Sequence, residues 1–318
     1  MKKKIVCIVL AMTMLVMGGC NNKEREENQE AYRQIGINCM EKEDYEGALE
    51  AFGKALDQSL AKIGERELDI CYYKAKAQYL AGKPEEAIKT YTALIDYDKK
   101  DSDALYLRGS LYLSQGREQE ALADFAEAVK YNKKDYELYI GLYEQLSAAG
   151  KETEAQEYLK QGLEISGKSG KAYTQRGRMY LLLEDLDNAE KELKEAEKQK
   201  DGDASFYMGL LYAQKGEQAK AEKLFESYVA EHEDDADALE QLADIALSEE
   251  DYEKAAGYLE KAVKASADGG SPAVRKKLIA AYESAGNFEQ AKKQMAEYVK
   301  AFPQDADAAR ENEFLQTR

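Results

Sequence analysis

The apolar positions of this chain follow one motif, an alanine with a large apolar residue four positions later. It recurs eight times, at spacings of 39, 34, 34, 34, 32, 34 and 36 residues. Because four positions are about one turn of an α-helix, the two residues of each motif lie on one helix face. The motifs are Ala48 with Phe52, Ala87 with Tyr91, Ala121 with Phe125, Ala155 with Leu159, Ala189 with Leu193, Ala221 with Phe225, Ala255 with Leu259 and Ala291 with Met295.

A small residue stands twelve positions before most of these alanines, which predicts a second helix ahead of each motif. Small residues let two helix backbones approach closely, and the large residue of the motif fills the adjoining space. In the fourth and eighth repeats Tyr143 and Ile279 stand at this place instead. The small residues are Gly36, Ala75, Gly109, Gly177, Gly209 and Ala243.

The turn between the two helices is marked in five repeats by a glycine five positions before the alanine. Glycine adopts the left-handed conformation that ends many helices. The pattern predicts eight helix-turn-helix units over residues 28–303, followed by a polar capping helix at 304–318. The wider first spacing predicts a longer helix or an added loop near residues 58–67. The turn glycines are Gly82, Gly116, Gly150, Gly216 and Gly286.

Together these residues resemble the tetratricopeptide repeat, as in YLRGSLYLSQGREQEALADFAEAV. The family's tryptophan near the start of the first helix is missing throughout, with tyrosine or leucine in its place in five repeats, and the family's closing proline survives only as Pro303. The resemblance implies an all-α fold, an α-solenoid superhelix of about eight repeats in which stacking supplies the core. The residues in place of tryptophan are Tyr32, Leu105, Tyr139, Tyr173 and Leu239.

The first twenty residues have the layout of a signal peptide, with a basic tip at residues 2–4 and an apolar run at 5–17. The run is short for a transmembrane helix. The sequence Met17-Gly18-Gly19-Cys20 resembles a bacterial lipobox, with Met17 in place of the usual leucine. The resemblance implies cleavage of residues 1–19 and lipid attachment to Cys20. An ordinary secretory signal with an incidental cysteine is the alternative.

A lipid on Cys20 would hold the chain at the outer face of a bacterial cell membrane or at an outer membrane. Residues 20–27 are expected to form a short tether, which at full stretch reaches roughly 25–30 Å. The repeat array would therefore lie close to its membrane.

The charge of the chain disfavours a nucleic-acid partner. The formal net charge is −17, and loss of Lys2, Lys3 and Lys4 with the leader would make it more negative. Such a surface repels phosphate. Because the carboxylates are dispersed, we interpret their excess mainly as a solubilising surface.

Candidate catalytic groups are scarce, and we expect neither an enzyme nor a bound cofactor or metal. The single histidine, His232, lies in an acidic turn without a nucleophile nearby. No GxSxG, HExxH, CxxC or phosphate-loop pattern is present. Cys39 and Cys71 are expected to be free buried thiols, because their offset of about 10 Å along neighbouring helices exceeds disulfide reach.

The resemblance implies that the first helices of successive repeats line a concave surface that receives protein segments. Exposed tyrosines suit such recognition because they combine apolar area with a hydroxyl group at low entropic cost. The same tyrosines could instead pack in the core. The candidate partner-binding residues are Tyr72, Lys76, Tyr79, Tyr106, Leu113, Arg178 and Phe206.

The sequence therefore predicts a membrane-anchored, extracytoplasmic adaptor or scaffold that mediates protein–protein interactions in a bacterial envelope. A binding module for an envelope glycan is the alternative, since tyrosines also stack on sugars. An enzyme with an unrecognised site is the third possibility, for which no residue can be nominated. The sequence names neither the partner nor the oligomeric state.

Overall fold

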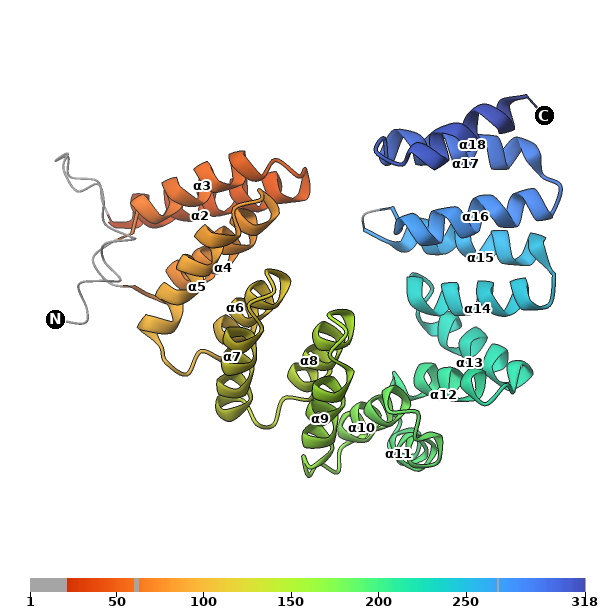
Figure 1. The fold of residues 1–318 in the computed structure, drawn as a ribbon, viewed down its shortest axis with the longest axis horizontal. Helices are drawn as coiled ribbons and strands as arrows, with labels where there is room; N and C mark the ends of the chain where they lie inside the picture. Colours follow the sequence, from red (N-terminus) through yellow and green to blue (C-terminus); the bar gives the residue numbers. More distant parts are fainter. Residues whose placement is uncertain (1–21, 60–62, 268, 318) are drawn as a thin grey trace. The chain divides into compact units, whose positions relative to one another are not determined.

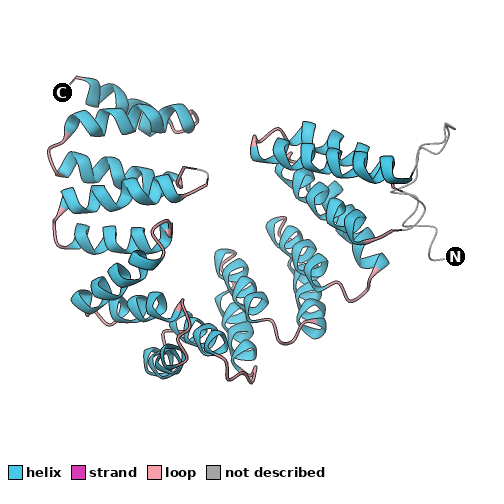
Figure 2. Ribbon diagram, turned by 180° about the vertical axis from the view of Figure 1, so that it is seen from behind, coloured by secondary structure: helices cyan, strands magenta, loops and turns pink. Residues whose placement is uncertain are grey.

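The computed structural model describes residues 22–59, 63–267 and 269–317. The expected leader at 1–19 and Cys20 lie outside the described residues. Within them every regular element is an α-helix (Figures 1 and 2). The all-α solenoid class predicted from the sequence is confirmed.

The chain divides into two compact units, the first ending at Ile165 and the second beginning at Ser166. Each unit consists of helix pairs that follow one another along the chain (Figure 1). The pairs of the first unit are α2 (Asn22–Glu41) with α3 (Tyr45–Asp57), α4 (Glu65–Leu80) with α5 (Pro84–Tyr97), α6 (Ser102–Ser114) with α7 (Glu118–Tyr131), and α8 (Tyr136–Ala148) with α9 (Glu152–Leu163).

The second unit continues the same plan and ends on an unpaired helix. That last helix, α18, buries Ala308 and Leu315 in a cluster with Met295 and Tyr298 of the preceding helix, as a cap would. The elements are α10 (Gly170–Leu182) with α11 (Leu186–Lys198), α12 (Ala204–Gln214) with α13 (Gln218–Glu231), α14 (Ala236–Ser248) with α15 (Tyr252–Ala265), α16 (Pro272–Ser284) with α17 (Phe288–Ala301), and α18 (Ala306–Gln316).

The helix pairs are held together by the predicted packing of a small residue against a large one. All eight motif alanines are fully buried, and the large residues that follow them are at most 4% exposed. A Cβ atom placed on Gly109 would lie 2.6 Å from the Phe125 ring, and one on Gly177 would lie 2.6 Å from Leu193. The first helix therefore needs a small residue at this point of contact.

The start of the array differs from the expected tether. Residues 22–27 form the first turns of α2 instead of an extended segment. Arg25 donates to the carbonyl of Gln58 (3.2 Å), and the buried Gln29 donates to Ser59 (2.9 Å) and Glu67 (2.9 Å). These contacts with the end of α3 and the start of α4 stabilise the polar N-terminal turns of α2 in the helical conformation.

Two features accommodate the extra residues between the first two motifs. α4 begins at Glu65, three residues earlier in the repeat than α6 does, and the connection from α3 occupies residues 58–64. The sequence left a longer helix and an added loop as alternatives, and the structure has both.

The turn between paired helices takes a left-handed residue in all eight repeats. The five predicted glycines have φ between 72° and 75°, and Glu43, Glu184 and Glu250 occupy the same place with φ between 57° and 59°. A left-handed conformation costs a non-glycine residue roughly 1–2 kcal/mol. Three turns of the array therefore carry local strain that the glycine turns lack.

We expect Glu250→Gly to raise the free energy of unfolding by roughly 0.5–1 kcal/mol, because relief of the left-handed strain exceeds the added entropy of the unfolded chain. Thermal and urea unfolding measure the change. The matched control is Glu249→Gly at the preceding residue, where φ is −88° and no strain is relieved. Equal effects of the two substitutions would contradict the explanation.

Candidate partner-binding surface

One face of α4 presents an exposed stripe, defined here as Lys76, Tyr79 and Leu80. Their spacing of three and four residues places them together on the helix surface. Lys76 is exposed, Tyr79 is 45% exposed and Leu80 is 40% exposed. Among the described residues, the Tyr79 side chain has neither a hydrogen-bond partner nor an aromatic neighbour. The α4 stripe thus offers apolar area that the fold does not use.

Tyr72 lies on the same face two turns earlier, but it is half-buried in the joint to the next repeat. Its hydroxyl donates to Asp101 at the start of α6 (2.5 Å), and its ring lies 6.1 Å from that of Tyr91. Burial, together with the hydrogen bond to Asp101, raises the pKa of Tyr72 far above its ordinary value. Tyr72 therefore helps to connect two repeats, in addition to any contact that its exposed edge makes with a partner.

Tyr106 has the corresponding position in the following repeat. Its ring lies 6.1 Å from that of Phe125, and its hydroxyl oxygen would be 2.9 Å from a Cβ atom placed on Gly141 of α8. Burial raises the pKa of its hydroxyl. Gly141 therefore gives Tyr106 room in the next helix pair, and an alanine at position 106 would disturb packing as well as any binding.

Leu113 occupies the place in α6 that Tyr79 occupies in α4. It is half-buried against a cluster that includes Phe125 and Leu146. The candidate residues of the first unit thus lie along the same side of successive first helices. Those on α4 are the more accessible ones.

Negative charge gathers at the start of α6, beside Tyr72. The pKa of Asp103 is raised, first by burial and then by the charges of Asp101 and Asp135. Asp101 itself caps α6 by accepting the backbone N–H of Ala104 (3.0 Å). A positively charged group placed here would relieve this repulsion.

The two candidates of the second unit are less accessible than the α4 stripe. Arg178 is half-buried. Phe206 lies in an aromatic cluster, with ring centroids 5.2 Å from Tyr207, 5.7 Å from Phe225 and 5.4 Å from Tyr228. A partner-binding role for Arg178 and Phe206 stays a prediction, and much of the Phe206 ring already has neighbours.

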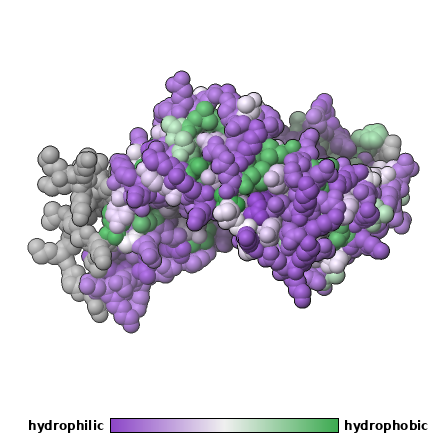
Figure 3. Space-filling view, turned by 90° about the horizontal axis from the view of Figure 1, so that it is seen from below, coloured by the Kyte–Doolittle hydropathy of each residue, from purple (hydrophilic) through white to green (hydrophobic). Residues whose placement is uncertain are grey.

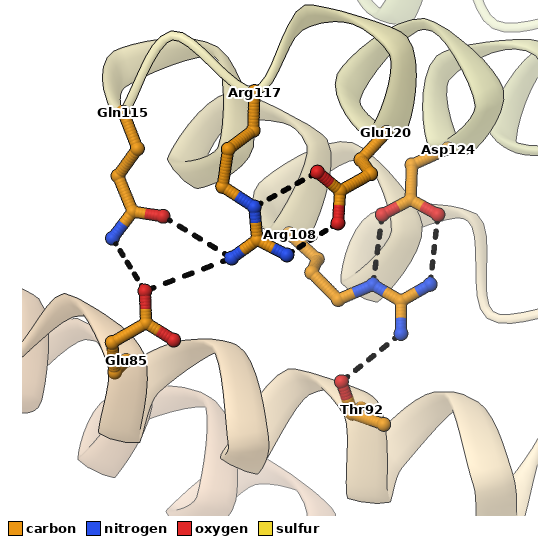
Figure 4. Close-up of polar contacts among 7 residues, drawn as sticks. All are labelled: Glu85, Thr92, Arg108, Gln115, Arg117, Glu120 and Asp124. Carbon is orange, nitrogen blue, oxygen red and sulfur yellow. Dashed lines mark hydrogen bonds and ion pairs between the residues drawn. The ribbon is translucent and has the colours of Figure 1, made fainter.

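A polar network joins the second and third helix pairs (Figure 4). Arg108 of α6 donates two N–H groups to the Asp124 carboxylate of α7 (2.8 and 2.7 Å) and a third to the Thr92 hydroxyl of α5 (3.0 Å). Arg117 pairs with Glu120 and also reaches Glu85 of α5 (3.6 Å). The network fixes the third pair against the second.

The pairing of Arg108 with Asp124 has a counterpart in the fifth repeat, which we did not predict from the sequence. Arg176 pairs there with Glu192 (2.8 and 2.7 Å) and also donates to the carbonyl of Gly167 (2.9 Å). In both repeats the arginine precedes its carboxylate by 16 residues. A search for charged residues at equal repeat positions would have found both pairs.

The histidine and the two cysteines of the described residues do not form a cluster that could act as a metal site. His232 is exposed at the end of α13 and stacks on Tyr228 at a centroid distance of 4.3 Å. Cys39 and Cys71 are free thiols; Cys71 is buried, whereas Cys39 is half-buried instead of fully buried as expected. Burial raises the pKa of Cys71 to about 11. No three His, Cys, Asp or Glu residues in the described portion of the chain are placed to hold a metal ion.

The surface in view in Figure 3 is mostly hydrophilic, with hydrophobic side chains gathered in a few patches. This agrees with a chain of which 34% is charged. Within residues 22–59, 63–267 and 269–317, no helix is both long enough and apolar enough to cross a bilayer.

Comparison with solved structures finds related folds. A tetratricopeptide repeat protein from Parabacteroides merdae is 21% identical, with a TM-score of 0.53 over 79% of this chain and 98% of that chain. A structure of the APC/C hetero-tetramer Cut9–Hcn1 gives a TM-score of 0.50 at 14% identity over 91% of this chain and 56% of that chain. At these identities the likeness concerns the fold alone. None of the curated proteins matches the chain.

Family models for the tetratricopeptide repeat match most of the chain. One matches residues 72–136, 174–238 and 206–270, and a second matches residues 246–310. The pairs α2/α3 and α8/α9 lie largely outside these ranges, yet the structure gives them the same helix-turn-helix form. The chain belongs to the tetratricopeptide repeat family.

Proposed function

We propose that this repeat scaffold is a lipid-anchored adaptor of the bacterial envelope, and that the α4 stripe is the centre of its partner-binding surface. The family and the fold support the general role, a scaffold for protein interactions. The observation that carries the site is the exposure of two adjacent apolar residues, Tyr79 and Leu80. Among the described residues the tyrosine makes neither a side-chain hydrogen bond nor an aromatic contact. Tyrosine is one of the residue types enriched among those that dominate the energy of protein interfaces.

The expected partner is a protein segment with an apolar side chain and a nearby basic residue. The apolar side chain would cover Tyr79 and Leu80. The basic residue would approach Asp101 and Asp103 at the start of α6, where burial and, after it, the neighbouring carboxylates raise the pKa of Asp103. Complementary charge of this kind favours correct orientation and speeds association.

The anchor rests on the sequence before α2. Gly18, Gly19 and Cys20 follow an apolar run and a basic tip, in the order typical of a lipoprotein signal. Lipid attached to Cys20 would place the helices that begin at Asn22 directly at a membrane surface. This location would give the scaffold partners in the envelope.

Replacing Tyr79 with alanine and Leu80 with serine together should weaken partner binding about tenfold, because a central apolar anchor is lost. The folded state should be affected much less than by a core substitution, since Tyr79 is 45% exposed and Leu80 is 40% exposed. Quantitative crosslinked pull-down from cells that express the full chain measures the change, alongside a thermal unfolding curve.

Lys89→Ala is the matched control, because Lys89 is an exposed residue of the neighbouring helix α5. Proteins that are retained by Lys89→Ala and lost by the double variant would support the site. Equal recovery with all three chains would contradict it. Binding of purified envelope glycans without any crosslinked protein would favour the glycan-binding alternative.

Cys20→Ala should abolish incorporation of labelled palmitate and release the chain from the membrane fraction, because Cys20 would be the attachment point of the lipid. Cys39→Ala is the matched control, since Cys39 lies within a helix of the array. Palmitate labelling that survives in Cys20→Ala would contradict the anchor.

A further inference from the structure

An open pocket lies between α3, α4 and α5, on a different side of α4 from the stripe. Its apolar lining includes Leu56, Leu68, Leu94 and Tyr97, and the buried Cys71 also lines it. The enclosed volume is small, so that a short branched group fits it better than a long chain. Ile63, which precedes α4 in the wider spacing between the first two repeats, also lines the pocket.

Lys74 is the one cationic residue among those that line this pocket. Its surroundings differ from those of the cations at the same position in the third and fifth repeats. Arg108 and Arg176 stand at the same repeat position, and each is paired with a carboxylate 16 residues later. In the second repeat the residue 16 positions after Lys74 is Thr90, which also lines the pocket. The cation is thus retained, while its carboxylate is replaced by a hydroxyl group.

The Thr90 hydroxyl is itself engaged within the fold. It donates to the side-chain oxygen of Gln78 (2.7 Å) and lies 3.1 Å from the carbonyl of Glu86. Among the described residues, Lys74 has no carboxylate partner, although its side chain is half-buried. A half-buried ammonium group gains most from a partner of opposite charge.

The pocket also contains one carboxylate, Glu67, which is already satisfied. Glu67 accepts hydrogen bonds from Gln29 (2.9 Å) and from the backbone N–H of Gly64 (2.8 Å), and these bonds lower its pKa. It precedes Lys74 by seven residues, or about 10 Å along the helix. The two ends of the pocket therefore differ, with a hydrogen-bonded acid at one end and, at the other, a cation that lacks a carboxylate partner among the described residues.

We propose that this pocket binds a carboxylate carried on a short branched hydrocarbon, with Lys74 pairing with the carboxylate and the leucines enclosing the hydrocarbon. The carboxylate replaces the partner that Asp124 provides in the third repeat and Glu192 provides in the fifth. The ligand is either a free branched-chain acid or the C-terminal aliphatic residue of a peptide. The site is independent of the α4 stripe, because Lys74 and Lys76 are two positions apart and point to different sides of α4.

The test is a methyl NMR titration of the full chain with 4-methylpentanoate, N-acetyl-leucine and the neutral N-acetyl-leucinamide. The methyl signals of Leu56, Leu68 and Leu94 should shift with at least one of the two acids. The amide should bind about tenfold more weakly, the loss expected for one charge-assisted contact. The tighter of the two acids identifies the source of the carboxylate.

Four variants separate recognition by Lys74 from general attraction to the chain. Lys74→Gln should weaken binding of the acid about tenfold, and Lys74→Arg should retain it. Lys76→Gln, which changes the same charge on the other side of α4, should bind like the unaltered chain. Thr90→Asp should abolish binding by supplying an internal carboxylate to Lys74. No shift with either acid, or equal binding of acid and amide, would overturn the proposal.

Discussion

Gly109→Leu should lower the free energy of unfolding of the first unit by about 3 kcal/mol or more, because it overfills the contact between α6 and α7. A Cβ atom on Gly109 would lie 2.6 Å from the Phe125 ring and 3.2 Å from the carbonyl oxygen of Ala121. The Phe125 ring is fully buried and the carbonyl belongs to the backbone, so neither can yield without displacing the helix. The gain of about 1 kcal/mol in helix propensity over glycine does not offset this loss.

The matched control is Gly53→Ala in α3, where a Cβ atom meets nothing within 4 Å. This substitution should stabilise the protein by roughly 0.5–1 kcal/mol through helix propensity alone. Urea unfolding followed by circular dichroism measures both changes. If Gly109→Leu stays within about 0.5 kcal/mol of the unaltered chain, the close approach of these two helices does not require a glycine.

Asp124→Ala should cost about 2–4 kcal/mol, because it leaves the Arg108 guanidinium group without its carboxylate in a largely buried setting. The Arg108 side chain is 17% exposed and that of Asp124 is 9% exposed. Arg108 also donates to Thr92 of α5, so the loss should loosen the joint between the second and third pairs as well.

Asp307→Ala provides the comparison, because its pair with Arg310 lies in solvent, with both side chains more than three-quarters exposed. Exposed pairs of this kind contribute about 0–1 kcal/mol. Thermal unfolding of both variants under the same conditions separates the two cases. A cost for Asp124→Ala no larger than that for Asp307→Ala would show that Arg108 is satisfied without its carboxylate.

The sequence predicted the helix pairs because their packing repeats. An alanine and a large apolar residue recur in all eight pairs and a small residue in six of them, so the pattern does not depend on any single position. The turns were predicted only where they contain glycine. Glu43, Glu184 and Glu250 adopt the same left-handed conformation, but a glutamate gives no local signal for it.

The exposure of the candidate site residues was harder to predict from the sequence than the helix pairs. Periodicity shows which face of a helix a residue occupies, but it does not show how deeply the residue is buried. Tyr72 and Tyr79 lie on the same face of α4, yet Tyr72 reaches Asp101 of the next pair, whereas Tyr79 makes no such contact with the described residues. The depth is set by the neighbouring helix, whose distance depends on residues far along the chain. Leu80 was missed for the same reason.

Site-specific photocrosslinking at position 79 shows directly whether the first-helix side of this scaffold binds protein segments. Benzoylphenylalanine is placed at position 79 or at position 89, an exposed residue of α5, in the full chain within the cells that make it. We expect discrete protein adducts from position 79 and few from position 89. Equal yields from the two positions, or no protein adduct at position 79, would contradict it.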